Sequence, residues 1–233
     1  MVIVLMGKSA VGKDTVLNEL VSEFDLTRVV SATNRVPREG ETDGKDYHFV
    51  TAEQFDEMIK NNEFIEHVEF NGVKYGCPKM SIDLDKDMCI VVETNGAKAF
   101  IEEFGKENVF VVNLTLDDKK RYERASNRSK ITFEEWQNRE ASDDERFKED
   151  VVSELANFDI RTDDEPYVVA SIIVDALEAY KECQALNPGE KCVVAEVYDE
   201  CNFYDFCKAY TELDYNKMVS DYYGEEDVEF DNV

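Results

Sequence analysis

The 233-residue sequence has few basic residues. Its 26 lysines and arginines stand against 53 aspartates and glutamates, which gives a formal net charge of −27. A chain this acidic lacks the general basic surface that displaces counterions from the phosphates of nucleic acids. The same deficit disfavours docking on anionic lipid. We therefore predict neither polymeric nucleic acid nor a membrane as a partner.

Prolines and glycines are also scarce, at four and ten, which excludes a collagen-like or linker-dominated chain. No apolar run approaches the ~18 residues of a membrane-spanning helix. The apolar run at the N-terminus is short and has no basic region before it, unlike a secretory signal. The six cysteines form no Cys-x-x-Cys pair, so we predict neither a zinc site nor a disulfide framework. These features indicate a cytoplasmic protein with reduced thiols.

Apolar residues make up 43% of the chain and aromatic residues 11%, which indicates a packed domain. Short apolar runs of the buried-strand type alternate with segments of helical spacing, a pattern that predicts an α/β fold with a parallel sheet. A hairpin signal at Asn71-Gly72 interrupts this alternation and predicts a separate small lobe. Strands are expected at 2–6, 27–30, 64–70, 73–75, 88–92, 108–114 and 158–160. Helices are expected at 14–24, 52–61, 97–104, 117–146 and 168–182.

The first motif that indicates chemistry is a glycine-rich segment, Gly7-Lys-Ser-Ala-Val-Gly12-Lys13. It follows the first expected strand directly and opens a helix, which is the setting of a phosphate-binding loop. Backbone N–H groups at such a turn and at a helix N-terminus point into one concavity and bind phosphate oxygens. Lys13 would neutralise charge on the β- and γ-phosphates. The segment predicts a nucleoside triphosphate site.

The residue after Lys13 departs from the usual pattern. That position normally holds Ser or Thr, whose hydroxyl binds Mg²⁺, whereas this chain has Asp14 followed by Thr15. One interpretation is that Asp14 contacts Mg²⁺ directly or through water. The other is that its charge stabilises the start of the helix, where negative groups are favoured. We retain Asp14 and Thr15 as candidate Mg²⁺ contacts.

A second motif concentrates arginine in a chain that has little of it. Arg35 and Arg38 flank Pro37, and Tyr47 follows nine residues after Arg38. Arginine offers two parallel N–H donors and tyrosine adds a hydroxyl, so these side chains can converge on one dianionic phosphate. The motif predicts a second phosphate site on the same chain.

The order of these motifs resembles that of guanylate kinase, the family that moves a phosphoryl group from ATP to GMP with Mg²⁺. The resemblance covers about residues 1–180 and leaves out the C-terminal extension. After the phosphate loop, the motifs that carry it are Ser31-Ala-Thr-Asn-Arg-Val-Pro-Arg38, Asp46-Tyr-His-Phe49, Phe64-Ile-Glu66 and Tyr75-Gly76.

The resemblance implies a P-loop NTPase fold, with a parallel sheet flanked by helices, a small mixed-β lobe that binds the monophosphate, and a helical lid. The implied boundaries are a core of 1–32, 87–116 and 151–182, a monophosphate-binding lobe of 33–86, a lid of 117–150 and an acidic, aromatic-rich extension of 183–233.

The resemblance also implies roles for individual residues. The implied catalytic residues are Lys13, Arg35, Arg128 and Arg139. The implied ATP contacts are Ser9, Val11, Gly12, Lys13, Asp14, Thr15, Arg124 and Arg128. The implied GMP contacts are Ser31, Arg35, Arg38, Tyr47, Glu66, Tyr75, Cys77 and Glu93.

Glu66 resembles the residue that reads guanine in this family. Guanine presents two adjacent donors, N1–H and N2–H, and one carboxylate can accept both; adenine would leave the buried charge unpaired. Without the surrounding motif, Glu66 and Glu93 would each be read as a solvated surface charge. Cys77 stands where the family usually has Ser or Thr, and a thiol is a weaker hydrogen-bonding group. Either Cys77 relaxes the preference toward dGMP or another deoxynucleotide, or the substitution is neutral.

A third group of arginines lies in the expected lid. Arg121, Arg124 and Arg128 are spaced to share one face of a helix, and Arg139 follows Arg128 by 11 residues, as in the family's lid. The resemblance implies that Arg124, Arg128 and Arg139 close over ATP. Spacing alone favours an ordinary solvated helix with ion pairs to the nearby Glu134, Glu135 and Glu140. Arg161 is a candidate for a contact on the adenine side.

We therefore expect an ATP-dependent nucleoside monophosphate kinase whose partners are ATP and GMP or dGMP, working as a monomer or weak homodimer. One alternative is a deoxynucleoside monophosphate kinase of other base preference. Another is a non-catalytic interaction module of the same fold, but such modules typically lose the loop or lid residues that this chain keeps. Residues 184–233 combine 13 acidic and 3 basic residues with nine aromatics, which favours a packed extension or a surface that binds a partner.

Overall fold

The computed structural model describes residues 1–38, 40–70, 72–129 and 131–186. Five strands form the main sheet: β1 (Val2–Met6), β2 (Thr27–Arg28), β7 (Met88–Val91), β8 (Val109–Thr115) and β9 (Phe158–Arg161). They lie in the order β2-β7-β1-β8-β9, and every neighbouring pair is parallel. All five residues of β1 are buried, as expected for a central strand covered on both faces. The predicted parallel α/β sheet is confirmed.

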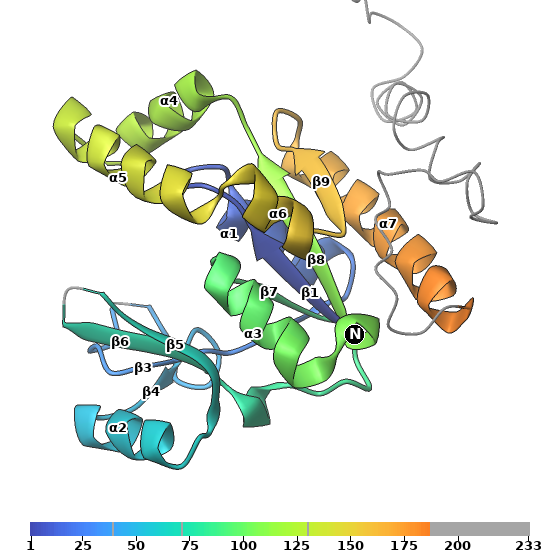
Figure 1. The fold of residues 1–233 in the computed structure, drawn as a ribbon. Helices are drawn as coiled ribbons and strands as arrows, with labels where there is room; N and C mark the ends of the chain where they lie inside the picture. Colours follow the sequence, from blue (N-terminus) through green and yellow to red (C-terminus); the bar gives the residue numbers. More distant parts are fainter. Residues whose placement is uncertain (39, 71, 130, 187–233) are drawn as a thin grey trace, which may run out of the picture.

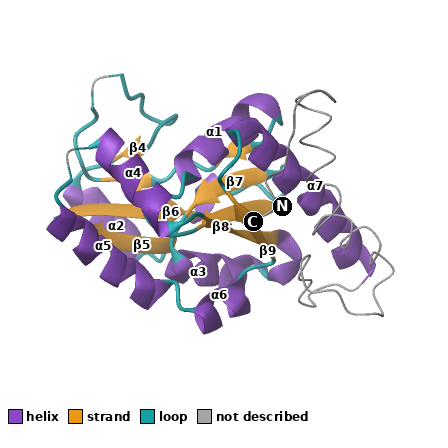
Figure 2. Cartoon of the chain, turned by 90° about the horizontal axis from the view of Figure 1, so that it is seen from above, coloured by secondary structure: helices purple, strands orange, loops and turns teal. Residues whose placement is uncertain are grey.

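Helices cover both faces of this sheet (Figure 2). Because successive residues of a strand point to opposite faces, Ile3 and Leu5 pack in one apolar cluster while Val2, Val4 and Met6 pack in another. The first cluster includes residues of α1 (Lys13–Glu23) and α7 (Pro166–Leu186). The second includes residues of α3 (Thr94–Phe104) and α6 (Glu149–Leu155).

A small lobe, which we define as β3 to β6 with α2, stands apart from the main sheet (Figure 1). Its mixed sheet has the order β4-β3-β6-β5, built from β3 (Ala32–Thr33), β4 (His48–Phe49), β5 (Phe64–Phe70) and β6 (Val73–Pro78). The predicted hairpin is confirmed, because β5 and β6 pair in antiparallel register. Helix α2 (Ala52–Lys60) begins with a capping box and buries Phe55 against Phe64 at 4.5 Å between ring centroids.

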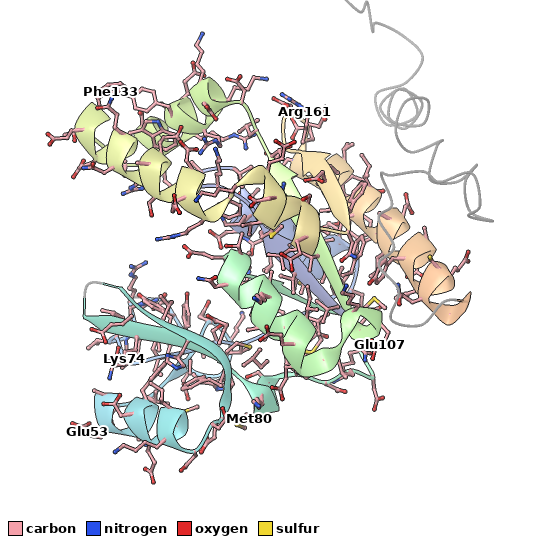
Figure 3. The ribbon with its side chains drawn as sticks, viewed as in Figure 1. Glu53, Lys74, Met80, Glu107, Phe133 and Arg161 are labelled. Atoms are coloured by element: carbon pink, nitrogen blue, oxygen red, sulfur yellow. The ribbon has the colours of Figure 1, made fainter. Side chains whose placement is uncertain are left out.

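The lid, which we define as α4 (Asp118–Arg128) and α5 (Phe133–Arg146), differs from the single helix expected at 117–146. Ser129 is in an extended conformation and ends α4, and Thr132 starts α5 with a reciprocal capping box to Glu135. This Thr-x-x-Glu pattern is a local start signal that the charge-rich composition concealed. Figure 3 shows Phe133 at the tip of the lid, away from the main sheet.

Several boundaries also differ from expectation. The strand expected at 27–30 contains only two residues, and α3 starts three residues earlier than expected, at Thr94. Helix α6 was not expected, and neither were the short strands β3 and β4 or the 3-10 turns at Lys79–Ser81 and Lys106–Asn108. The prediction for the extension lies outside the described residues from residue 187 onward. In the part of the chain that is described, no helix is long and apolar enough to cross a membrane.

Candidate active site

The phosphate loop (residues 7–13) connects the end of β1 to the start of α1. Gly7 and Gly12 have φ values of 149° and 110°, a region that side chains disfavour. A Cβ on Gly7 would lie 2.4 Å from the carbonyl oxygen of Leu114 on β8. The glycines therefore let the loop pass close to the sheet edge while it opens toward the helix N-terminus.

Lys13 is held inside this loop. Its Nζ donates to the carbonyl oxygens of Gly7 at 2.5 Å and Lys8 at 3.1 Å. Burial lowers the pKa of Lys13, and the nearby carboxylates, Asp143 foremost, oppose that shift. The ammonium group therefore sits among acceptors and anionic neighbours at the centre of the loop.

A cavity of about 600 Å³ separates the phosphate loop from the small lobe. Both Ser9 and Lys13 line it on the loop side. Of the residues predicted to bind GMP, it brings together Ser31, Tyr47, Glu66, Tyr75 and Glu93. Residues from five different strands and loops thus line one space.

Arg35 lies beside this cavity with its guanidinium occupied by Glu41. Two parallel N–H···O bonds of 2.6 Å join them, and the backbone N–H of Arg38 donates to the same carboxylate at 2.7 Å. The Arg35 guanidinium also lies 5.1 Å from the Tyr47 ring centroid. The hydrogen bond to Glu41 raises the pKa of Arg35, and that from Arg35 lowers the pKa of Glu41 to about 2. The Arg38 side chain is exposed.

Glu41 was not singled out from the sequence. Its only local signal was an acidic residue six positions after Arg35, in a chain full of acidic residues. The structure shows that this one carboxylate fixes the arginine loop.

Glu66 points into the cavity from β5, half-buried. Burial, and then the charge of Glu93, raises the pKa of the Glu66 carboxyl to about 7. Glu93, at the end of β7, is exposed and pairs with Arg146 of α5 at 2.5 Å. This ion pair joins the C-terminal end of α5 to the loop between β7 and α3.

Cys77 differs from its expected place on the cavity wall. It pairs with Glu66 across the hairpin, but its side chain is fully buried in the apolar cluster beneath α3. Its sulfur lies 3.9 Å from the carbonyl oxygen of Pro78, and burial raises the pKa of the thiol. The thiol therefore packs in the core instead of facing the cavity.

A second cavity, of about 420 Å³, lies on the other side of the loop. The lid supplies three of its lining residues, Arg124, Arg128 and Arg139. The loop and the first turn of α1 supply the rest, which are Ser9, Ala10, Gly12, Lys13, Asp14 and Thr15. The predicted lid arginines and loop residues are thus brought together.

The arginines of the lid have different environments. Within the described residues, Arg128 and Arg139 form no ion pair, so the solvated helix with paired charges is not what the structure shows for them. Arg124 donates to the carbonyl oxygens of Val11 at 2.8 Å and Thr162 at 2.6 Å. That arrangement ties α4 to the loop and to the end of β9.

Val11, predicted to contact ATP, is fully buried. Its side chain therefore packs in the core, and only its backbone can contribute to the phosphate loop. A smaller cavity of about 240 Å³ continues past it, between Thr15, Thr162 and Pro166. Arg161 does not line that cavity; it is two-thirds exposed and pairs with Asp163. Figure 3 shows Arg161 near the end of β9, at the molecular surface.

Asp14 and Thr15 are exposed on the wall of the second cavity. The N-cap of α1 is Gly12, and no side chain caps the helix, so Asp14 contributes only its charge to the first turn. No cluster of three or more His, Cys, Asp or Glu side chains suited to a metal occurs in the described part of the chain. A metal here would need oxygens from a bound phosphate beside those of Asp14 and Thr15, which is the usual setting of Mg²⁺.

Comparisons with known proteins agree with this arrangement. The family model described as guanylate kinase matches residues 1–160. Guanylate kinase of Clostridium tetani (strain Massachusetts / E88) is 32% identical over 203 residues, which cover 85% of this chain and 90% of that protein. Guanylate kinase of Clostridioides difficile (strain 630) is 40% identical over 119 residues, 49% of this chain and 58% of that protein. The crystal structure of guanylate kinase from Anaplasma phagocytophilum superposes with a TM-score of 0.56 at 26% identity, covering 78% of this chain and 86% of that chain.

Proposed function

Because the chain belongs to the guanylate kinase family, we propose that it transfers the γ-phosphoryl group of ATP to GMP or dGMP and releases ADP. The observation that carries this proposal is that Ser9 and Lys13 line both cavities. A donor triphosphate on one side and an acceptor monophosphate on the other would meet at the loop. Phosphoryl transfer needs little more than such positioning and charge neutralisation.

On the donor side, Lys13, Arg124, Arg128 and Arg139 supply four cationic groups around one cavity. We assign them to the triphosphate and to the charge that develops as the phosphoryl group moves. The chemistry that Mg²⁺ supplies when bound is neutralisation of the β- and γ-phosphate charges, and Asp14 with Thr15 would hold it. The backbone of the loop from Ser9 to Thr15 contributes N–H donors.

On the acceptor side, Ser31, Tyr47 and Tyr75 offer hydroxyl groups to a phosphate, with Arg35 beside them. Arg38 is assigned to the same phosphate, because its side chain is free to turn inward from solvent. Glu66, deeper in the cavity, accepts the N1–H and N2–H donors of guanine. Glu93 stands between the base pocket and the loop, where the family resemblance places an acidic residue.

A coupled assay for ADP release tests the proposal with GMP, dGMP, AMP, CMP and UMP as acceptors. We expect turnover with GMP and dGMP and little with the others, and loss of turnover in Lys13→Met. Lys60→Met is the matched control, because Lys60 is an exposed lysine at the end of α2. Turnover with another base would indicate a kinase of different preference, and background with every acceptor would indicate a non-catalytic module.

A further inference from the structure

The last turns of α5 contact the phosphate loop at two residues: Lys8 pairs with Asp144 at 2.6 Å, and Ser9 is held through its backbone. The backbone N–H of Ser9 donates to Oδ2 of Asp143 at 2.7 Å. The carbonyl oxygen of Ser9 accepts from Nη1 of Arg121 at 3.2 Å. Both backbone groups of this loop residue are therefore bound by lid side chains.

The contact is notable because the N–H groups of a phosphate loop are donors for phosphate oxygens. Here a carboxylate, which is also an anionic oxygen acceptor, takes one of them. Asp143 is only 5% exposed and lines the acceptor cavity near Lys13 and Glu93. It lies where the phosphates of the two substrates would approach.

Asp143 is backed by a buried ionic network. Arg121 is 1% exposed and pairs with Glu140 at 2.6 Å and Asp118 at 2.7 Å, while Asp143 lies 3.9 Å away. The Arg121 guanidinium also lies 5.5 Å from the Trp136 ring centroid. Because Arg121 keeps two closer carboxylates, neutralising Asp143 leaves Arg121 paired. The charge of Asp143 is therefore not required to balance the network.

We propose that Asp143 is a positioning residue for phosphoryl transfer: its carboxylate holds the Ser9 amide and competes for that donor with a phosphate oxygen of the nucleotide. The inference rests on the proposed kinase activity. An anionic phosphate and an anionic carboxylate cannot share one N–H donor and the neighbouring lysine without repulsion. Nucleotide binding therefore competes with Asp143.

Two effects follow, and they separate in the kinetics. The hydrogen bond orders the loop, which supports kcat; the negative charge competes with phosphate, which raises KM for ATP. Asp143→Asn keeps an acceptor oxygen for Ser9 but removes the charge, and a charge-assisted hydrogen bond is about twice as strong as a neutral one. We expect KM for ATP to fall about fivefold with kcat within about twofold of wild type. Asp143→Ala removes both effects, and we expect kcat to fall about tenfold.

The experiment is steady-state kinetics of the full chain with varied ATP at saturating GMP, together with thermal unfolding. Glu145→Gln is the matched control, because it removes the same charge from the same helix at an exposed residue that pairs with Lys148 on the surface. It should match wild type. A lower KM for ATP in Asp143→Asn supports the inference, and an unchanged or higher KM overturns it.

If Asp143 had a purely structural role, its replacement would lower the melting temperature without lowering KM for ATP. Measuring both quantities therefore separates the two roles. If Asp143→Ala does not fold, the isosteric asparagine variant alone decides. An inactive wild type would instead overturn the proposed function, which keeps the two failures distinct.

Discussion

Replacing Glu66 by glutamine is predicted to stabilise the protein at alkaline pH while it weakens guanine binding. The Glu66 carboxyl has its pKa raised from 4.5 to about 7, by burial and then by the charge of Glu93. The folded protein therefore binds this proton more tightly than the unfolded chain does. Since stability falls with pH wherever the folded state holds more protons, the wild type loses stability as pH rises from 4.5 through 7.

The two pKa values give the size of the effect. Linkage predicts that ionising Glu66 lowers the free energy of unfolding by about 2 kcal/mol between about pH 5.5 and about pH 8. Glutamine does not titrate, so Glu66→Gln lacks this loss, and comparing the two proteins removes the titrations that they share. Urea unfolding of the two proteins at both pH values measures the difference. Parallel pH dependences would refute the reasoning.

Binding gives a second readout of the same group. Only the carboxylate accepts both guanine donors, so the wild-type KM for GMP should rise about tenfold from about pH 8 to about pH 6. The phosphate of GMP also titrates in this range. Glu66→Gln experiences the same phosphate titration and is therefore the control. It should show a higher KM at pH 8 and a flatter pH profile; an equally steep profile would assign the dependence to the nucleotide.

Three further substitutions test the site. Glu41→Gln breaks the two-bond pair with Arg35, so KM for GMP should rise about tenfold. The control Glu57→Gln, at an exposed residue of α2, should match wild type. Equal KM values for the two variants would exclude a positioning role for Glu41. Cys77→Ser places a hydroxyl in an apolar cluster, so it should lower the free energy of unfolding by about 1 kcal/mol. The ratio of GMP to AMP turnover should stay unchanged, and a shift in that ratio would show that the side chain reaches the base. Gly7→Ala meets a main-chain oxygen at 2.4 Å, so it should destabilise the protein by about 2 kcal/mol or more, and an unchanged melting temperature would contradict the observed loop geometry.

The parts of the fold that could be predicted are those with local signals. A fully apolar strand followed by a glycine-rich turn identified β1 and the loop, and the Asn71-Gly72 pair identified the β5–β6 hairpin. The lid was expected as one helix because its charge is continuous along the sequence. The break depends on the capping box of Thr132, a short signal within that charged stretch.

The contacts that organise the site depend on residues far apart in the sequence. Ser9 and Asp143 are separated by 134 positions, and no spacing rule connects them. Arg121 was grouped with the other lid arginines on helical spacing, yet it is the one that is buried, because Trp136, Glu140 and Asp118 surround it. The same holds for Cys77. The sequence shows its position in the motif, but its burial depends on the packing of α3 against the sheet.

We propose above all that one phosphate loop serves a donor and an acceptor nucleotide on its two sides. The most direct measurement is transfer of label from [γ-³²P]ATP with GMP present, followed by separation of the nucleotides. We expect label in GDP for the wild type, and none for Lys13→Met. Label found only in inorganic phosphate, or remaining in ATP, would contradict it.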